Sequence, residues 1–134
     1  MKKISSFLIL ISLFMLAGCD NRKTYADFSD LHLDRKTAFT VAKSEYYIYF
    51  YQSNCPACDN VKAKVIAQAK KGKIPLYFIN LDDIYVAPAP DKEYSNIGAS
   101  KFSELKIYGT PELLLLKDGI VTAQFIGLTI NEQL

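Results

Sequence analysis

Four apolar stretches of strand length, each bounded by polar or turn-forming residues, stand out along the chain. They predict strands over residues 46–51, 76–81, 113–116 and 120–126. The first two are aromatic and β-branched on both faces, which is typical of strands buried inside a sheet. Asp118-Gly119 separates the last two, and this dipeptide favours a tight turn between antiparallel strands.

Helical periodicity is strongest over residues 56–71. The positions that would share one face of this helix are apolar: Val61, Val65, Ile66 and Ala69. Gly72 is expected to end the helix. Shorter helices are expected over 34–43, where Asp34 would be the cap, and over 100–106. The prolines at 88 and 90 predict a long irregular connection over 84–98.

This order of elements predicts an α/β fold in a single domain. The strands on either side of the 56–71 helix are expected to pair in parallel, and the last two strands to pair antiparallel. The result is a central mixed sheet of about four strands flanked by helices. Because the chain ends at Leu134, the C-terminal helix is expected to be short or absent.

The N-terminus has the parts of a secretory signal. Lys2 and Lys3 precede an apolar run that is short for a membrane span, and Leu16-Ala17-Gly18-Cys19 follows it. This tetrapeptide resembles the bacterial lipobox, in which the cysteine is lipidated and becomes the first residue of the mature protein. The resemblance implies a signal peptide over 1–18, acyl chains such as palmitate on Cys19, and attachment to the outer face of the cytoplasmic membrane. An ordinary cleaved signal or an uncleaved anchor is the alternative.

Beyond the signal, residues 19–27 are polar and predict a tether to a folded domain over 28–134. The chain has 16 Lys and Arg against 14 Asp and Glu, and removal of 1–18 leaves no net charge, which argues against nucleic acid as a partner. Three cysteines and His32 are too few for a disulfide scaffold or a complete Cys/His metal site, so no metal and no cofactor is expected.

Cys55-Pro56-Ala57-Cys58 lies between the 46–51 strand and the first turn of the following helix. A thiol at this place faces unpaired backbone N–H groups and the positive end of the helix dipole, both of which favour the thiolate. Cys55 is therefore expected to be the exposed, attacking cysteine, with a lowered pKa. Cys58, about one turn further, is expected to be more buried and to resolve a mixed disulfide.

Two structural interpretations compete with a redox pair. Half of a zinc site would need two more good ligands, and the domain offers only His32 and carboxylates. A purely structural disulfide across so short a loop would constrain the unfolded chain little. The redox interpretation is therefore preferred.

Together with the cysteine pair, two further segments resemble the thioredoxin-like superfamily, over roughly residues 34–130. They are Asn80-Leu81-Asp82 at the end of a strand and Gly109-Thr110-Pro111 before another. The resemblance implies a thioredoxin-like fold, a cis peptide bond before Pro111, and a Thr110 backbone that pairs with substrate beside the cysteines. The other neighbours of the active site would be Asn54, Pro56, Ala57 and Glu112.

Several positions depart from the pattern of the superfamily. Thioredoxins keep a buried aspartate for proton transfer six residues before the first cysteine, where this chain has Tyr49, and Phe78 replaces the lysine that accompanies it. Asn54 replaces a frequent tryptophan. Proton removal from Cys58 is therefore expected to use water, Tyr49 or a carboxylate from elsewhere, of which Glu112 is one candidate.

These features predict a membrane-tethered thiol–disulfide oxidoreductase that acts on exported cysteine-containing proteins or peptides, together with a membrane redox partner. The lipid anchor and the aromatic strand also resemble the thioredoxin-like bacteriocin transport accessory proteins. One alternative is a non-catalytic accessory subunit of an export system. Another is a metal chaperone, which would want additional Met, His or Cys near Cys55. Reversible cycling of the cysteine pair distinguishes the enzyme from the accessory subunit.

Overall fold

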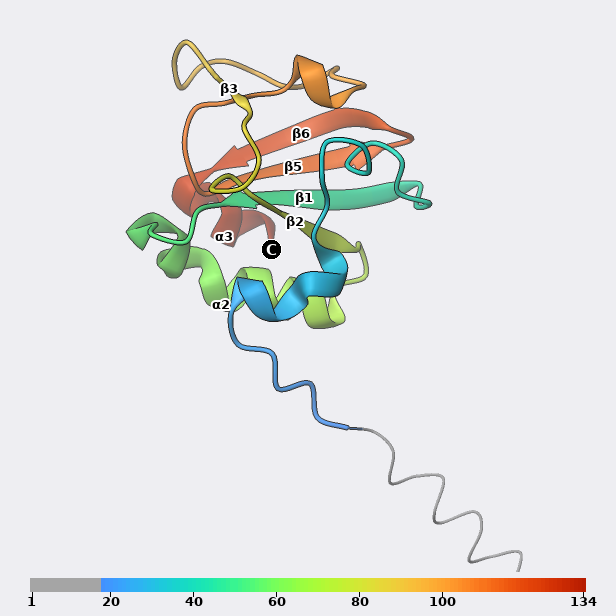
Figure 1. The fold of residues 1–134 in the computed structure, drawn as a ribbon, viewed down its shortest axis with the longest axis vertical. Coiled ribbons are helices and arrows are strands. Elements are labelled where there is room, and N and C mark those ends of the chain that lie inside the picture. The colour runs from blue at the N-terminus through green and yellow to red at the C-terminus, as the bar shows by residue number, and fades with distance from the viewer. Residues whose placement is uncertain (1–17) are drawn as a thin grey trace, which may run out of the picture.

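The computed structural model describes residues 18–134, so the predicted signal peptide lies, but for Gly18, outside the described residues. Figure 1 shows a sheet with helices against one face and mostly irregular chain over the other. The strands are β1 (Glu45–Tyr51), β2 (Leu76–Asn80), β3 (Ala87–Pro88), β4 (Lys106–Ile107), β5 (Glu112–Lys117) and β6 (Ile120–Ile126). The α-helices are α2 (Pro56–Lys71) and α3 (Ile130–Gln133), and the 3₁₀ helices are η2 (Tyr25–Leu31), η3 (Phe102–Glu104) and η4 (Gly127–Thr129).

The main sheet has the strand order β2-β1-β5-β6. β1 is parallel to β2 and antiparallel to β5, and β5 and β6 form an antiparallel hairpin. At its turn Asp118 and Gly119 take positive φ angles of 49° and 76°, as a two-residue connection of this kind requires. The predicted mixed sheet of four strands is therefore confirmed, and α2 and β6 have the predicted bounds.

The side chains of β1 alternate between two hydrophobic layers. Its odd-numbered tyrosines lie in the layer under α2, η2 and α3. Its even-numbered residues lie in the layer under residues 33–41 and 84–107. The four-residue α3 confirms the short C-terminal helix, and the second face of the sheet is covered by the long connection instead of by a long helix.

Two of the predicted short helices are wrong. Residues 34–43 form a turn in which the Asp34 carboxylate accepts the amides of Lys36 and Thr37. The β-branched residues that follow disfavour a longer helix. Residues 100–106 contain only η3, because the backbone becomes extended at Leu105 and enters β4. Within the described part of the chain, no helix has both the length and the apolar character of a membrane span.

The N-terminal tether is shorter than predicted, because η2 belongs to the fold. Tyr25 and Phe28 are 7% and 0% exposed, so the domain begins before residue 28. Their rings pack against that of Phe78 on β2, with centroids 5.7 and 5.3 Å away. The separation of three residues places both rings on one side of η2, which docks this segment against the edge strand of the sheet.

Candidate active site

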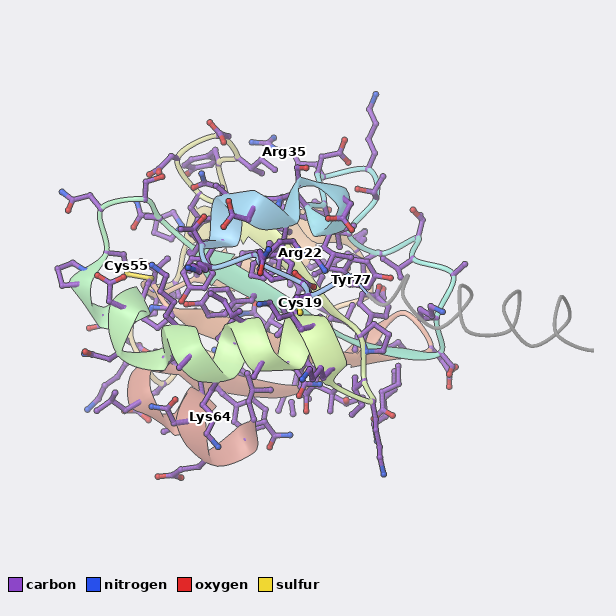
Figure 2. The ribbon with its side chains drawn as sticks, turned by 90° about the horizontal axis from the view of Figure 1, so that it is seen from below. Cys19, Arg22, Arg35, Cys55, Lys64 and Tyr77 are labelled. Carbon is purple, nitrogen blue, oxygen red and sulfur yellow. A yellow bond between two sulfur atoms is a disulfide. The ribbon has the colours of Figure 1, made fainter. Side chains whose placement is uncertain are left out.

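Cys55 and Cys58 lie at the N-terminal end of α2, shortly after the end of β1 (Figure 2). They form a disulfide with a Cα–Cα distance of 5.2 Å. Cys55 is the N-cap residue, and Pro56 fits the first helical position because its missing N–H needs no partner there. Cys58 is 2% exposed whereas Cys55 is half-buried, so the predicted asymmetry of exposure is confirmed.

Two hydrogen-bond donors reach the sulfur of Cys55. The amide N–H of Cys58 donates to it across 3.1 Å. The hydroxyl oxygen of Thr110 lies 3.3 Å from the same sulfur and 3.1 Å from Gln52 Oε1, and its single proton serves one acceptor at a time. Hydrogen bonds to a charged acceptor are stronger than those to a neutral one, so both donors stabilise a thiolate at Cys55 once the disulfide opens.

Thr110 reaches the disulfide from the loop between β4 and β5. The Thr110–Pro111 peptide bond is cis, and Pro111 is buried. The amide of Gly127 donates to the Pro111 carbonyl across 3.0 Å and ties this loop to the end of β6. The cis bond and the position of the loop beside Cys55, both implied by the resemblance, are confirmed.

Tyr49 fills the position of the missing aspartate and is fully buried. Its hydroxyl oxygen lies 2.9 Å from that of Tyr25, which donates to the carbonyl oxygen of Cys58 across 2.7 Å. Since the Tyr25 proton is used in that bond, Tyr49 donates to Tyr25. Burial raises the pKa of Tyr25 to about 12 and also raises the pKa of Tyr49. Both phenols therefore stay neutral at physiological pH, and neither acts as a base for Cys58.

Glu112 lies on the face of the sheet opposite to the cysteines. It is paired with Phe50 in the register of β1 and β5, and its Oε1 accepts the side-chain amide of Asn96 across 3.2 Å. Alternation along β5 directs its carboxylate away from Cys58, so the prediction that Glu112 accepts the Cys58 proton is wrong. The side chain is fully buried, its Oε2 has no hydrogen-bond partner among residues 18–134, and burial raises its pKa to about 7.

A cavity of about 290 Å³ opens beside both cysteines. Tyr25 and Tyr51 contribute aromatic walls, and Asp59 supplies the one carboxylate among the lining residues. A second hollow of about 370 Å³ adjoins Thr110 and is lined mainly by residues 84–88 and 107–109. Both cysteines therefore border space that solvent and small groups can enter.

The remaining predicted neighbours, Asn54, Pro56 and Ala57, are exposed around the disulfide. The sequence interpretation missed Tyr25 and Asp59. The polar stretch around Tyr25 hides it, although its spacing from Phe28 is a signal of a packed segment. Asp59 carries no distinct signal, because acidic residues are common in the first turn of any helix.

No protein-family model matches this sequence. Solved structures do share its fold. Thioredoxin f2 from Chlamydomonas reinhardtii is 15% identical with a TM-score of 0.53, over 77% of this chain and 88% of that one. Thioredoxin f from spinach chloroplast is 14% identical with a TM-score of 0.53, over 76% and 78%. A thioredoxin variant from Halobacterium salinarum is 20% identical with a TM-score of 0.51, over 73% and 77%. The chain therefore has a thioredoxin-like fold.

Proposed function

We propose that this chain is a thiol–disulfide oxidoreductase that is exported and held at the outer face of the cytoplasmic membrane by a lipid on Cys19. One observation carries the redox part of the proposal. The half-exposed sulfur of Cys55 has two hydrogen-bond donors, while Cys58 is buried one turn further along α2. This arrangement favours an attacking thiolate at the first position and a resolving thiol at the second.

In the oxidising direction, a substrate thiolate attacks the Cys55 sulfur, the Cys55–Cys58 bond breaks, and its electron pair leaves with the Cys58 sulfur. A second substrate thiolate then attacks the substrate sulfur of the mixed disulfide and releases the Cys55 thiolate. The substrate loses two electrons and gains a disulfide, and the cysteine pair takes up those electrons together with two protons. In the reducing direction the same steps run backwards, and Cys55 attacks the substrate disulfide.

The proton of Cys58 moves through the cavity beside the disulfide. Asp59 lines this cavity and is the next residue in the chain. Its carboxylate is 72% exposed and lies 3.8 Å from Lys62 Nζ, so it is in contact with solvent as well as with the cavity. Asp59 is therefore the candidate acceptor, and the proton reaches it by way of solvent, unlike in thioredoxins, where the aspartate is buried.

The position of Cys19 supports the lipid anchor. Cys19 is exposed, and the buried part of the chain begins shortly after it at Tyr25. A single acyl chain holds a protein to a bilayer only weakly, so stable attachment needs a second chain or a further membrane contact. The partners at this place are exported proteins or peptides that contain cysteine, and a membrane redox protein that restores the pair.

A narrower proposal is that the chain is a thioredoxin-like accessory of bacteriocin transport. The lipobox and the aromatic strand β1 before the cysteines support it. In that setting the chain works either as the enzyme or as a binding subunit whose disulfide stays closed. The neutral Tyr49 in place of a carboxylate is the observation that favours the binding subunit.

Equilibration of the protein in glutathione buffers of defined redox ratio distinguishes these two roles. Alkylation followed by mass spectrometry measures the fraction of Cys55–Cys58 disulfide. The enzyme predicts one reversible two-electron transition, approached equally from the oxidised and the reduced protein. Cys55→Ser is the control, because it cannot form the bond. A disulfide that stays closed at every ratio supports the binding subunit instead.

A further inference from the structure

The N-terminal segment is fastened along α2. Lys70 Nζ, in the last turn of the helix, donates to the backbone carbonyl of Asp20 across 2.9 Å and lies 4.0 Å from the Asp20 carboxylate. Tyr25 reaches the first turn through its hydrogen bond to the Cys58 carbonyl. From Cys58 to Lys70 the helix rises about 18 Å. Figure 2 accordingly shows the disulfide at one end of α2 and Cys19 toward the other.

Lysines extend along α2 toward the end of the domain near Cys19. Between residues 60 and 81 the chain has five lysines and no Asp or Glu. Lys62 lines the cavity beside the disulfide, Lys64 lies at mid-helix, and Lys70, Lys71 and Lys73 lie at the end of α2 that is near Cys19. Lys64, Lys71 and Lys73 are exposed, and none of the carboxylates of residues 18–134 pairs with them. Together with Lys70 they form what we call the lysine face. The charges of Lys64, Lys71 and Lys73 are therefore free to meet an external anion, whereas that of Lys70 lies beside Asp20.

The disulfide end is acidic by contrast. Asp82 and Asp83 follow β2 after Leu81, and the Asp82 carboxylate accepts the amide of Ser53 in the loop before the cysteines across 2.8 Å. Asp59 adds a third carboxylate beside the disulfide, and Lys62, 3.8 Å from it, is the one lysine that lines the same cavity. Since the two ends of α2 carry charges of opposite sign, a negative surface attracts one end of the domain and repels the other.

We propose that the lysine face binds the anionic headgroups of the membrane that holds Cys19, and thereby keeps the disulfide away from the bilayer. This rests on the lipid anchor proposed above. Each lysine held at an anionic surface strengthens binding roughly fivefold, and the attraction fades beyond a Debye length of about 8 Å. Because Lys70 contacts Asp20, the end of the lysine face at Lys70 and Lys71 lies next to the anchor, and Lys64 lies about 9 Å further along α2. The lysine face supplies a further membrane contact beside the acyl chains on Cys19.

This orientation deepens the proposed function. The disulfide and its adjoining cavity then face away from the lipid headgroups. They point toward the space into which exported proteins emerge. The fastened N-terminal segment leaves little slack between anchor and domain, so the lysine face holds one orientation instead of letting the domain tumble.

Lysine acetylation of the lipidated protein in vesicles tests the proposal. The protein is reconstituted in phosphatidylcholine alone or with added phosphatidylglycerol, and mass spectrometry gives the rate at each lysine and the mass of the Cys19 peptide. We expect Lys64, Lys71 and Lys73 to react at least about fivefold more slowly on the anionic vesicles. The protection should disappear in about 1 M salt, where the Debye length is about 3 Å. Lys92 and Lys101, over the opposite face of the sheet, should react equally on both.

Charge reversal provides the matched variants. Lys64→Glu with Lys71→Glu should abolish the protection of Lys73, whereas Lys92→Glu with Lys101→Glu should leave it intact. Equal labelling of a lipidated chain on both kinds of vesicle overturns the docking alone. A Cys19 peptide without lipid overturns the anchor and the docking together. Neither result argues against the proposed redox function, because the glutathione equilibrium tests that function separately.

Discussion

The hydroxyl oxygen of Thr110 lies 3.3 Å from the sulfur of Cys55, although 55 residues separate the two in the chain. The fold makes this contact by bringing the loop before β5 against the start of α2. A donor at this place favours the thiolate form of Cys55 over the thiol. The contact therefore links the loop that carries the cis proline to the reactivity of the attacking sulfur.

Thr110→Val removes this donor with little change of size. We expect the pKa of the reduced Cys55 to rise by about one unit, because a hydrogen bond to a charged group contributes about 1.5–3 kcal/mol, of which part is recovered by water. The rate of alkylation as a function of pH measures the pKa. Thr122→Val on β6, where the hydroxyl donates to Leu115, is the matched control. An alkylation profile identical to wild type in Thr110→Val would contradict the assigned role.

Asp59→Asn tests the proton path. We expect the closing of a mixed disulfide by Cys58 to slow by about tenfold or more, since general-base catalysis commonly contributes at least this much. Stopped-flow reaction of the reduced protein with a chromogenic disulfide separates attack by Cys55 from resolution by Cys58. Asp91 is exposed in the long connection over 84–98, and Asp91→Asn should leave both phases unchanged. If Asp59→Asn alters neither phase, the proton reaches solvent without this carboxylate.

The two cysteines should differ in the adducts that they trap. Cys58→Ser leaves the attacking thiol without a resolving partner, so it should accumulate thiol-sensitive adducts with exported proteins or a membrane redox protein. Cys55→Ser should accumulate few, because its remaining thiol is buried. Non-reducing electrophoresis of membranes from the producing cell shows the adducts. Equal trapping by both variants would overturn the division of roles.

Glu112 should make the folded state less stable as the pH rises. Its pKa is raised from 4.5 to about 7 in the fold, so the folded state holds this proton more tightly than the unfolded chain does. The stabilisation is complete below about pH 4.5 and is lost through pH 7, with a total loss of about 3 kcal/mol. Glu112→Gln keeps an acceptor for Asn96 but does not titrate. Its free energy of unfolding in urea should therefore stay level between about pH 5 and 8.

The exposed Glu93→Gln is the control for this measurement and should follow the wild type. A wild-type slope in Glu112→Gln would show that the loss of stability arises elsewhere. The carboxylates with lowered pKa, such as Asp82 and Glu104, act in the opposite sense and at lower pH. They do not interfere in this window.

Cys19→Ala tests the lipid anchor directly. The variant should appear unprocessed or be released from membranes, because Cys19 is the residue that carries the proposed acyl chains. Fractionation of cells followed by intact-mass measurement gives both results. A variant that stays bound to membranes and differs in mass from the wild type only by the substitution would mean that another feature holds the chain there.

The strands and α2 were predictable because their signals are local. β1 and β5 contain continuous apolar runs, β6 follows the Asp118-Gly119 turn, and α2 has a capped start, an apolar stripe and a terminal glycine. The exposure of Cys55 and the burial of Cys58 followed from the place where that helix begins. Residues 34–43 show the limit of a local signal, because the Asp34 side chain caps a single turn as well as it caps a helix.

The contacts of the candidate site depend instead on distant partners. Tyr25 lies in a polar stretch, and its burial requires Tyr49 and Phe78 from two strands. The face on which Glu112 lies depends on the register of β5 beside β1, and a shift of one residue would reverse it. The spacing of Tyr25 from Phe28 indicates a packed segment, but nothing in the sequence near Tyr25 or Glu112 identifies their distant partners.

The pairing of Tyr25 with Tyr49 gives the redox couple a simple dependence on acidity. A buried carboxylate beside the resolving cysteine would add its own titration to the midpoint potential. Two phenols that remain neutral add no such titration. Opening the disulfide therefore exchanges two electrons and two protons. The midpoint potential falls by about 59 mV per pH unit until Cys55 itself ionises. A partner dithiol whose two thiols also stay protonated follows the same slope. Between two such pairs the driving force stays constant as the surroundings acidify, and it changes with pH only where a cysteine of either pair ionises.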